Sequence, residues 1–384
     1  MLLILYSRKI NKKHKRNCIN ITIGLVDMEN NNLFIIDERK ILTNLENIKR
    51  VIGNDTKYCA IVKADAYGLG LETVCSILDG KVDYYGVACL SEALKIRKFD
   101  KNTNIIILGV VDLIDIEKCI ENNIDISVSS IEYLQSIIKY NNLNIHLQVN
   151  TGLNRFGIRS ISSFNKALNI IEKSNCRLVG VYSHFATKES DLNFIKFQFY
   201  KFLQFKRLCK SEKIVFHIAN SFGTIADKRY HLDMVRTGML MYGGAHNNIG
   251  NEFVLSIKSK ILAIQNVRKG ETVGYDRTFK SKKSMKIAIV GIGYADGIDR
   301  RLSNNFYVLI NNKKCQIIGL ICMDAMMVDV SNIDARMGDE VTILGCCGKY
   351  NITIEDMSEA IGASPYELMC RFNTKRMNKI VIRS

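Results

Sequence analysis

Residues 60–70 read AIVKADAYGLG, a short apolar run that ends in a lysine, Lys63. An amine at the end of a buried strand is costly unless it is paired or its pKa falls, although a lysine there can also extend to solvent. No Gly-x-Gly-x-x-Gly motif follows the run, so the fingerprint of a dinucleotide-binding, doubly wound sheet is missing. This stretch therefore favours another arrangement of parallel strands, with Lys63 at a strand end.

Seven further β-rich runs follow the first, and spacers such as 91–99 and 194–208 carry the 3.6-residue periodicity of helices. Eight alternating β and α units predict an α/β fold, a parallel (β/α)₈ barrel of the TIM type. A doubly wound sheet is the alternative, which the count of eight and the missing glycine motif disfavour. The runs are CAIVK (59–63), YYGVA (84–88), NIIIL (104–108), IDISV (124–128), IHLQV (145–149), RLVGVYS (177–183), IVFHIA (214–219) and LDMVR (232–236).

The pattern changes at about residue 253, where β-rich runs punctuated by Gly, Asn and Asp replace the alternation. We expect three parts: a basic, disordered extension over 1–28, the barrel over 29–252, and a mainly β C-terminal domain over 253–384. One helix is expected in that domain over 353–361, capped by Thr353 and Asp356.

Composition excludes several classes of protein. No apolar run approaches 18 residues, so we expect no membrane span, and the 12 scattered cysteines suit a reduced, cytoplasmic protein. Neither Cys nor His clusters at ligand spacing, so no metal site is expected. The net charge of +16 suggests nucleic acid, but no segment interleaves basic and aromatic residues as a stacking platform requires, so we expect no nucleic-acid partner.

Polar residues follow several predicted barrel strands at their C-terminal ends, where the active sites of such barrels lie. Each has an ordinary explanation alone, such as a helix cap or a surface charge, but together they indicate a site. The loops after strands 7 and 8, ANSFGT and RTGM, offer hydroxyls and backbone N–H groups suited to phosphate. A phosphate site opposite a lysine points to pyridoxal 5'-phosphate, which bonds covalently to lysine. The strand-end residues are Lys63, Arg155, His184, Asn220, Ser221, Arg236 and Gly238.

Over residues 33–382 the chain resembles the alanine racemase family, a group of barrel-fold pyridoxal-phosphate enzymes. The resemblance implies interconversion of L- and D-alanine, which supplies D-alanine for peptidoglycan, by a homodimer whose subunits share their active sites. It rests on VKADAYGLG, NTGLNRFG, SHFATKE, HIANS, RTGMLMYG, VGYDRTF, GIGYADGIDR, ICMDAMMVDV, GDEVTILG and YELMCRF, in the family's order and spacing.

The resemblance also implies a role for individual residues. Lys63 binds the cofactor covalently and is one catalytic base, and Tyr275, reaching in from the partner subunit, is the other. Arg155 and the backbone of Met323 bind the substrate, while Tyr294 and Arg300 line its entrance. We expect Gly68 and Gly70 to let backbone pass close to the cofactor. The cofactor-binding positions are Lys63, Tyr67, His184, Asn220, Ser221, Arg236, Gly238, Met239 and Tyr366.

Three positions depart from the family pattern. Gln148 replaces a lysine that is often carbamylated, Asn150 replaces an acid, and Phe279 replaces a tyrosine. We expect the carbonyl of Gln148 to orient Arg155 in place of the carbamate. Two other functions stay open: a racemase for serine or a broader set of amino acids, and a non-catalytic pyridoxal-phosphate carrier. Carriers resemble the barrel alone, so the C-terminal domain argues against the second.

Overall fold

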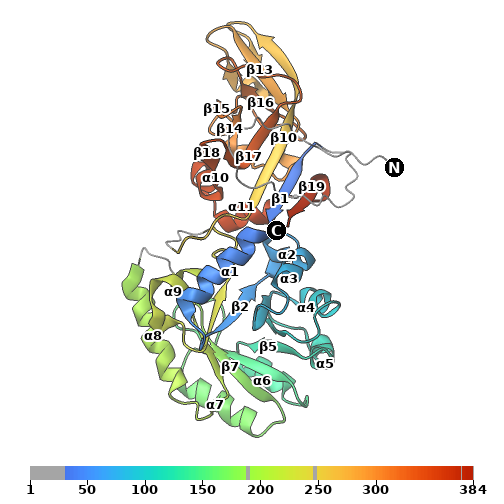
Figure 1. Cartoon of the computed structure of the whole chain (residues 1–384). Coiled ribbons are helices and arrows are strands. Elements are labelled where there is room, and N and C mark those ends of the chain that lie inside the picture. Colours follow the sequence, from blue (N-terminus) through green and yellow to red (C-terminus); the bar gives the residue numbers. More distant parts are fainter. Residues whose placement is uncertain (1–30, 187–190, 245–248, 373, 384) are drawn as a thin grey trace, which may run out of the picture.

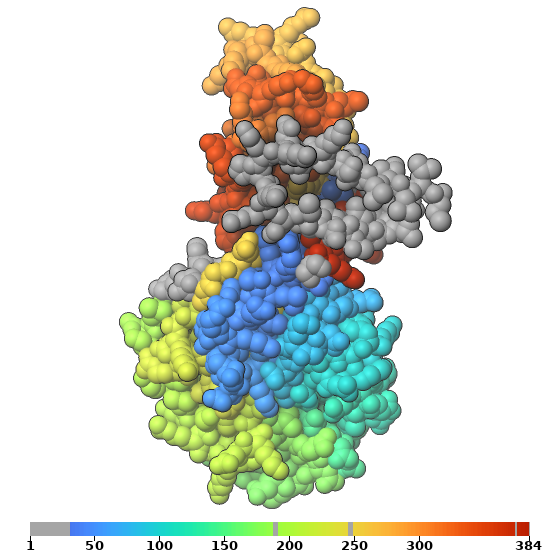
Figure 2. Space-filling model, viewed as in Figure 1, coloured from blue at the N-terminus to red at the C-terminus, as the bar shows by residue number. Residues whose placement is uncertain are grey.

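The computed structural model describes residues 31–186, 191–244, 249–372 and 374–383. These residues form two lobes, a wide one coloured mainly blue to yellow and a narrower one coloured mainly orange to red (Figures 1 and 2). The extension expected over 1–28 lies outside the described residues. None of the described helices is both long and apolar enough to cross a membrane.

The wide lobe contains eight parallel strands in a nearly closed barrel, as predicted from the eight runs. Neighbours in sequence are neighbours in the sheet from β2 to β8, and β9 pairs with β2. Between β8 and β9 no ladder forms, but Asp233 and Arg236 donate backbone hydrogen bonds to Phe216 and Ala219. The strands are β2 Lys57–Ile61, β3 Tyr84–Val87, β4 Asn104–Ile107, β5 Ile124–Val128, β6 Asn144–Gln148, β7 Arg177–Tyr182, β8 Val215–His217 and β9 Met234–Thr237.

Helices cover the outside of the barrel, and side chains fill its interior, so most strand residues are buried on both faces. The two helical spacers predicted at 91–99 and 194–208 correspond to α4 and α8. The covering helices are α1 Glu38–Ile52, α3 Leu71–Leu78, α4 Leu90–Arg97, α5 Ile116–Glu121, α6 Ile131–Ile137, α7 Ile161–Glu172, α8 Leu192–Lys206 and α9 Ser221–Ala226.

The narrower lobe is mainly β, as expected. A nine-stranded sheet is joined by the hairpin β11–β12 and two helices, α10 and α11; α10 begins after Thr353, which forms the predicted capping box with Asp356. The elements are β1 Leu33–Asp37, β10 Leu255–Val267, β11 Thr272–Val273, β12 Phe279–Lys280, β13 Met285–Val290, β14 Tyr307–Ile310, β15 Lys313–Gln316, β16 Met326–Asp329, β17 Glu340–Cys347, β18 Tyr350–Ile352, α10 Ile354–Ile361, α11 Pro365–Arg371 and β19 Asn378–Ile382.

The first described strand, β1, belongs to this second sheet. It runs antiparallel to β10 and parallel to β19, and in Figure 1 the blue arrow lies among orange and red strands. The segment 29–252 therefore contributes one strand to the C-terminal lobe before it enters the barrel through α1.

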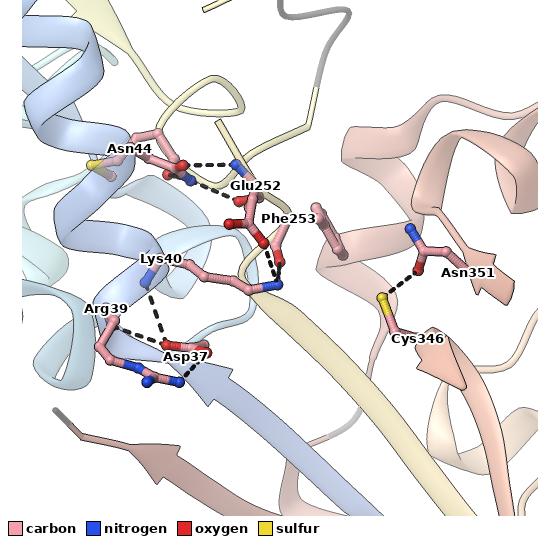
Figure 3. A network of polar contacts seen from close by, with 9 residues as sticks. Asp37, Arg39, Lys40, Asn44, Glu252, Phe253, Cys346 and Asn351 are labelled. Atoms are coloured by element: carbon pink, nitrogen blue, oxygen red, sulfur yellow. Dashed lines mark hydrogen bonds and ion pairs between the residues drawn. The ribbon is translucent and has the colours of Figure 1, made fainter. Parts of the chain in front are cut away.

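Helix α1 also fixes the point where the chain leaves the barrel (Figure 3). The amide of Asn44 donates to the carbonyls of Met241 and Glu252 at 2.9 and 2.8 Å, and its oxygen accepts from the Glu252 N–H at 2.8 Å. The ammonium of Lys40 contacts the Glu252 carboxylate at 3.1 Å and the Phe253 carbonyl at 3.4 Å. These contacts hold the connection to β10 against the barrel, which sets the position of the second lobe.

Candidate active site

A cavity of about 470 Å³ opens at the C-terminal ends of the barrel strands. It brings together most of the strand-end residues that the sequence predicts, from β2, β6, β7, β8 and β9. Its volume suits a small-molecule site. The predicted residues in its wall are Lys63, Tyr67, Arg155, His184, Asn220, Ser221, Arg236, Gly238 and Tyr366.

Lys63 follows β2 and is partly buried in the cavity wall. Burial lowers the pKa of its amine, and the positive charges of Arg155 and Arg236 lower it further. A lowered pKa means that the uncharged amine is present at a lower pH than for an ordinary lysine. The unprotonated amine is the form that can bond to a carbonyl or accept a proton.

Arg236 on β9 holds the neighbouring His184 in one protonation state. One guanidinium nitrogen of Arg236 donates to the Ser183 carbonyl at 2.7 Å and to Nδ1 of His184 at 3.2 Å. A guanidinium can only donate, so Nδ1 of His184 accepts and its proton lies on Nε2. Burial, with the charges of Arg236, Arg155 and Lys63, lowers the pKa of His184 to about 3. The imidazole is therefore neutral.

Hydroxyl groups form a recess in another part of the cavity. The Ser221 hydroxyl accepts from the N–H groups of Gly238 and Leu240, both at 3.3 Å, and is hydrogen-bonded to Tyr366. A Cβ atom on Gly238 would lie 2.4 Å from the Tyr67 hydroxyl oxygen, so only glycine leaves room there. Three hydroxyls beside a bare backbone suit a phosphate, and together with Lys63 they fit pyridoxal phosphate.

Asn220 and Met239 flank this recess differently. Asn220 lines the cavity and caps α9, because its side-chain oxygen accepts from the Gly223 N–H at 2.9 Å. Met239 is fully buried, and its side chain is not part of the cavity wall. Met239 would therefore contact a cofactor through its backbone and not through its side chain.

Arg155 is exposed at the cavity, in a loop after β6. Asn150 shapes this loop by accepting from the N–H groups of Gly152 and Asn154 at 3.0 and 3.2 Å. Gln148 is buried in the same wall, but the described part of the chain contains no hydrogen bond between Gln148 and Arg155. No carboxylate among the described residues pairs with Arg155, which leaves its charge available to an anionic ligand.

Tyr275 and Met323 are not brought to this cavity within one chain. Both lie in the C-terminal lobe, where their exposed fractions are 66% and 53%. Tyr275 lines a separate cavity of about 600 Å³ together with Tyr294 and Arg300. The barrel cavity is therefore without its expected second base unless another chain supplies one.

Family models agree with this division into two lobes. The model for the alanine racemase N-terminal domain matches residues 36–246, and the model for the C-terminal domain matches residues 254–381. The chain belongs to the alanine racemase family. Its class as an isomerase, expected from the sequence, is thereby confirmed.

Alanine racemases of known sequence and structure cover nearly the whole chain. Alanine racemase 1 of Caldanaerobacter subterraneus subsp. tengcongensis is 32% identical over 354 residues, 87% of this chain and 91% of that protein. The structure of alanine racemase from Bacillus anthracis with bound L-Ala-P is 31% identical, with a TM-score of 0.85 over 92% of this chain and 96% of that one. The alanine racemase from Bartonella henselae with covalently bound pyridoxal phosphate is 26% identical, with a TM-score of 0.84 over 92% and 99%.

The turn that carries Lys63 has a backbone that the sequence analysis missed. Residues 64–67 have φ between 53° and 58°, a left-handed turn of four residues without glycine. Such a conformation costs roughly 1–2 kcal/mol per residue. Glu92 of α4 offsets part of this cost: one carboxylate oxygen accepts from Ala64 N–H at 2.7 Å and Asp65 N–H at 3.4 Å, and the other accepts from Ala88 N–H at 2.8 Å. Glu92 thus fixes, from a neighbouring element, the turn that directly follows Lys63.

Replacing Glu92 with glutamine leaves one carbonyl oxygen for three N–H groups. We expect Glu92→Gln to lower the fraction of protein that binds pyridoxal phosphate covalently and to lower kcat about tenfold, since a charge-assisted hydrogen bond contributes roughly 1.5–3 kcal/mol. Borohydride trapping followed by mass measurement gives the fraction. Glu72→Gln is the matched control, because Glu72 is an exposed glutamate on α3, the helix that precedes α4. Equal trapping and kcat in both variants would show that Glu92 does not position Lys63.

The expectation for Gly68 and Gly70 is wrong. Gly68 has φ of 85°, and a Cβ there would lie 2.7 Å from the Met369 carbonyl; one on Gly70 would lie 2.0 Å from the ammonium of Lys379. Neither glycine lines the cavity. They let the turn approach α11 and β19 of the C-terminal lobe, not the cofactor.

Three more polar residues lie inside the barrel and were also missed: Asp125, His146 and His217, each less than 5% exposed. Asp125 and His146 alternate with apolar residues in the runs IDISV and IHLQV, and His217 is the one polar residue of IVFHIA, which is the signal that could have revealed them. Among the described residues, no group of three His, Cys, Asp or Glu side chains is arranged to hold a metal ion.

Proposed function

We propose that the chain is a pyridoxal-phosphate-dependent alanine racemase that interconverts L- and D-alanine with two bases, Lys63 and Tyr275. The observation that carries the proposal is Lys63, with a lowered pKa, facing a cavity that also holds a hydroxyl-lined recess and a buried arginine. The Bartonella henselae relative, which carries the cofactor covalently, supports it.

The cofactor would be held at both ends. Lys63 would bind its aldehyde carbon, and the hydroxyls of Tyr67, Ser221 and Tyr366 its phosphate, while Arg236 would donate to its ring nitrogen. When bound, pyridoxal phosphate withdraws electrons from the substrate carbon that loses its proton. Arginine does not give up its proton, so the ring stays a weaker electron acceptor. We infer less leakage toward transamination.

Racemisation removes a proton from one face of the substrate carbon and returns one on the other, so it needs a base on each face. Lys63 is one base. Tyr275, exposed on the C-terminal lobe, would be the second base of the partner subunit's cavity, and the exposed Met323 would offer its backbone N–H there to the substrate carboxylate. This arrangement requires a homodimer.

His184 would support the tyrosine base. Its Nδ1 accepts from Arg236, so its Nε2–H is free to donate. A donor directed at Tyr275 of the partner subunit stabilises the phenolate form, and a neutral imidazole does so without giving up a proton at ordinary pH. Arg155, which has no carboxylate partner in the described chain, would bind the substrate carboxylate.

The partners and setting follow from the same proposal. The substrate is a small amino acid, D-alanine would serve peptidoglycan, and the eleven described cysteines are all free, which suits a reduced cytoplasmic compartment. A serine or broad-specificity racemase remains the alternative, since a pocket rejects one added hydroxyl weakly.

A racemisation assay over a panel of amino acids with added cofactor tests the function. We expect alanine to give the highest kcat/KM in both directions and serine to follow. A higher kcat/KM for serine or a larger residue would replace the proposed substrate. Cofactor binding without racemisation of any amino acid would indicate a carrier.

A further inference from the structure

Arg236 is a buried charge without a direct counter-ion. Arg236 is 3% exposed, and no carboxylate of the described residues lies within ion-pair distance of its guanidinium. One of its nitrogens donates to Nδ1 of His217 at 2.7 Å. Because an isolated buried charge is costly, the surroundings of His217 decide how Arg236 is stabilised.

A line of hydrogen bonds leads from His217 to a carboxylate. Nε2 of His217 lies 3.0 Å from Nδ1 of His146, and Nε2 of His146 lies 3.2 Å from Oδ2 of Asp125. Both rings are fully buried, and Asp125 is 4% exposed. The three side chains come from β8, β6 and β5, so the line crosses the interior of the barrel.

The direction of each hydrogen bond in this line is fixed. Arg236 can only donate, so Nδ1 of His217 accepts and its proton lies on Nε2. His217 therefore donates its Nε2–H to Nδ1 of His146. Because Nδ1 of His146 accepts, the ring proton of His146 lies on Nε2, which donates to Oδ2 of Asp125. Burial and the charge of Arg236 also lower the pKa of His217 well below its ordinary value, which agrees with a neutral ring.

A second arginine, Arg177, determines which hydrogen bond the other oxygen of the Asp125 carboxylate accepts. Nε of Arg177 donates to the side-chain oxygen of Asn144 at 2.8 Å, which orients that amide. The Asn144 nitrogen then donates to Oδ1 of Asp125 at 2.9 Å. Asp125 therefore accepts hydrogen bonds from both His146 and Asn144. A side chain with a donor group at this position would face the donor of one of these two residues.

We propose that Asp125 is a positioning residue of the proposed racemase: through His146 and His217 it supplies the terminal acceptor and the counter-charge that keep Arg236 in one orientation toward the cofactor. The effect on catalysis rests on the proposed function. The donor-to-acceptor direction of the hydrogen bonds from Arg236 to Asp125, which we call the polarity of the line, is present in the protein without cofactor.

The polarity is tested directly by NMR of the cofactor-free protein labelled with ¹⁵N-histidine, with signals assigned from His146→Gln and His217→Gln. We expect both rings to be neutral with the proton on Nε2. A proton on Nδ1 of either ring would overturn the proposal, whether or not the protein is a racemase, and this measurement needs no substitution at Asp125.

The consequence is tested with Asp125→Asn, whose amide must donate either to Asn144 or to His146. We expect kcat for alanine and the affinity for pyridoxal phosphate each to fall about tenfold, the size expected for one unsatisfied buried hydrogen-bonding group, while KM changes little. Asp100→Asn is the control: Asp100 is also buried, at 7% exposed, but it accepts hydrogen bonds from Asn102 and Thr103 in its own loop and has no contact with a histidine of the line. Wild-type kcat and cofactor affinity in folded Asp125→Asn would overturn the proposal, and an equal loss in Asp100→Asn would reduce it to a stability effect.

Discussion

Lys63→Ala should abolish the borohydride-reducible bond between protein and pyridoxal phosphate and lower the racemisation rate by at least about a thousandfold. A general base contributes roughly 10²–10⁴-fold, and this lysine would also anchor the cofactor. Intact mass after borohydride reduction measures the bond, and peptide mapping locates it in the wild-type protein.

Lys57 provides the matched control for this prediction. It is an exposed lysine at the start of β2, the strand whose other end leads to Lys63. Lys57→Ala should keep the covalent cofactor and the wild-type rate. A reducible bond that persists in Lys63→Ala would refute the assignment of the cofactor lysine, even if activity were lost.

Tyr275→Phe should lower racemisation by roughly 10²–10⁴-fold while leaving the covalent cofactor in place, because it removes one base and no cofactor contact. The loss should be unequal on the two substrate faces. Exchange of the α-proton with deuterated solvent should stay close to wild type for the enantiomer whose proton Lys63 removes and should fall for the other.

Tyr350→Phe, a tyrosine in β18 of the same lobe, is the control and should behave as wild type. Equal loss of exchange from L- and D-alanine in Tyr275→Phe would contradict a two-base mechanism. Loss of the cofactor itself would show that Tyr275 acts in binding instead of proton transfer.

The barrel could be predicted from the sequence because its strands are buried on both faces and appear as short apolar runs. The ends of some runs were wrong: IVFHIA was expected to be a strand to Ala219, but β8 ends at His217, and CAIVK was expected to reach Lys63, but β2 ends at Ile61. The place of β1 could not be predicted, since its partners β10 and β19 lie far away in the sequence and pairing is not encoded locally.

The site was predictable wherever a functional residue follows a strand, as Lys63 and His184 do. It was not predictable where function depends on contacts between elements. Ala64 and Ala66 have no preference for the left-handed conformation that they adopt, and the turn forms against Glu92 of another element. Asp125 gains its importance only from the positions of His146 and Asn144 on the neighbouring strand.

The central claim is that one site takes Lys63 from one chain and Tyr275 from its partner. Co-expression of differently tagged Lys63→Ala and Tyr275→Phe chains, followed by tandem purification, isolates the mixed dimer. One of its two sites would then contain both intact residues, so we predict about half the racemisation rate of the wild-type dimer. A confirmed mixed dimer no more active than either parent variant would contradict the claim.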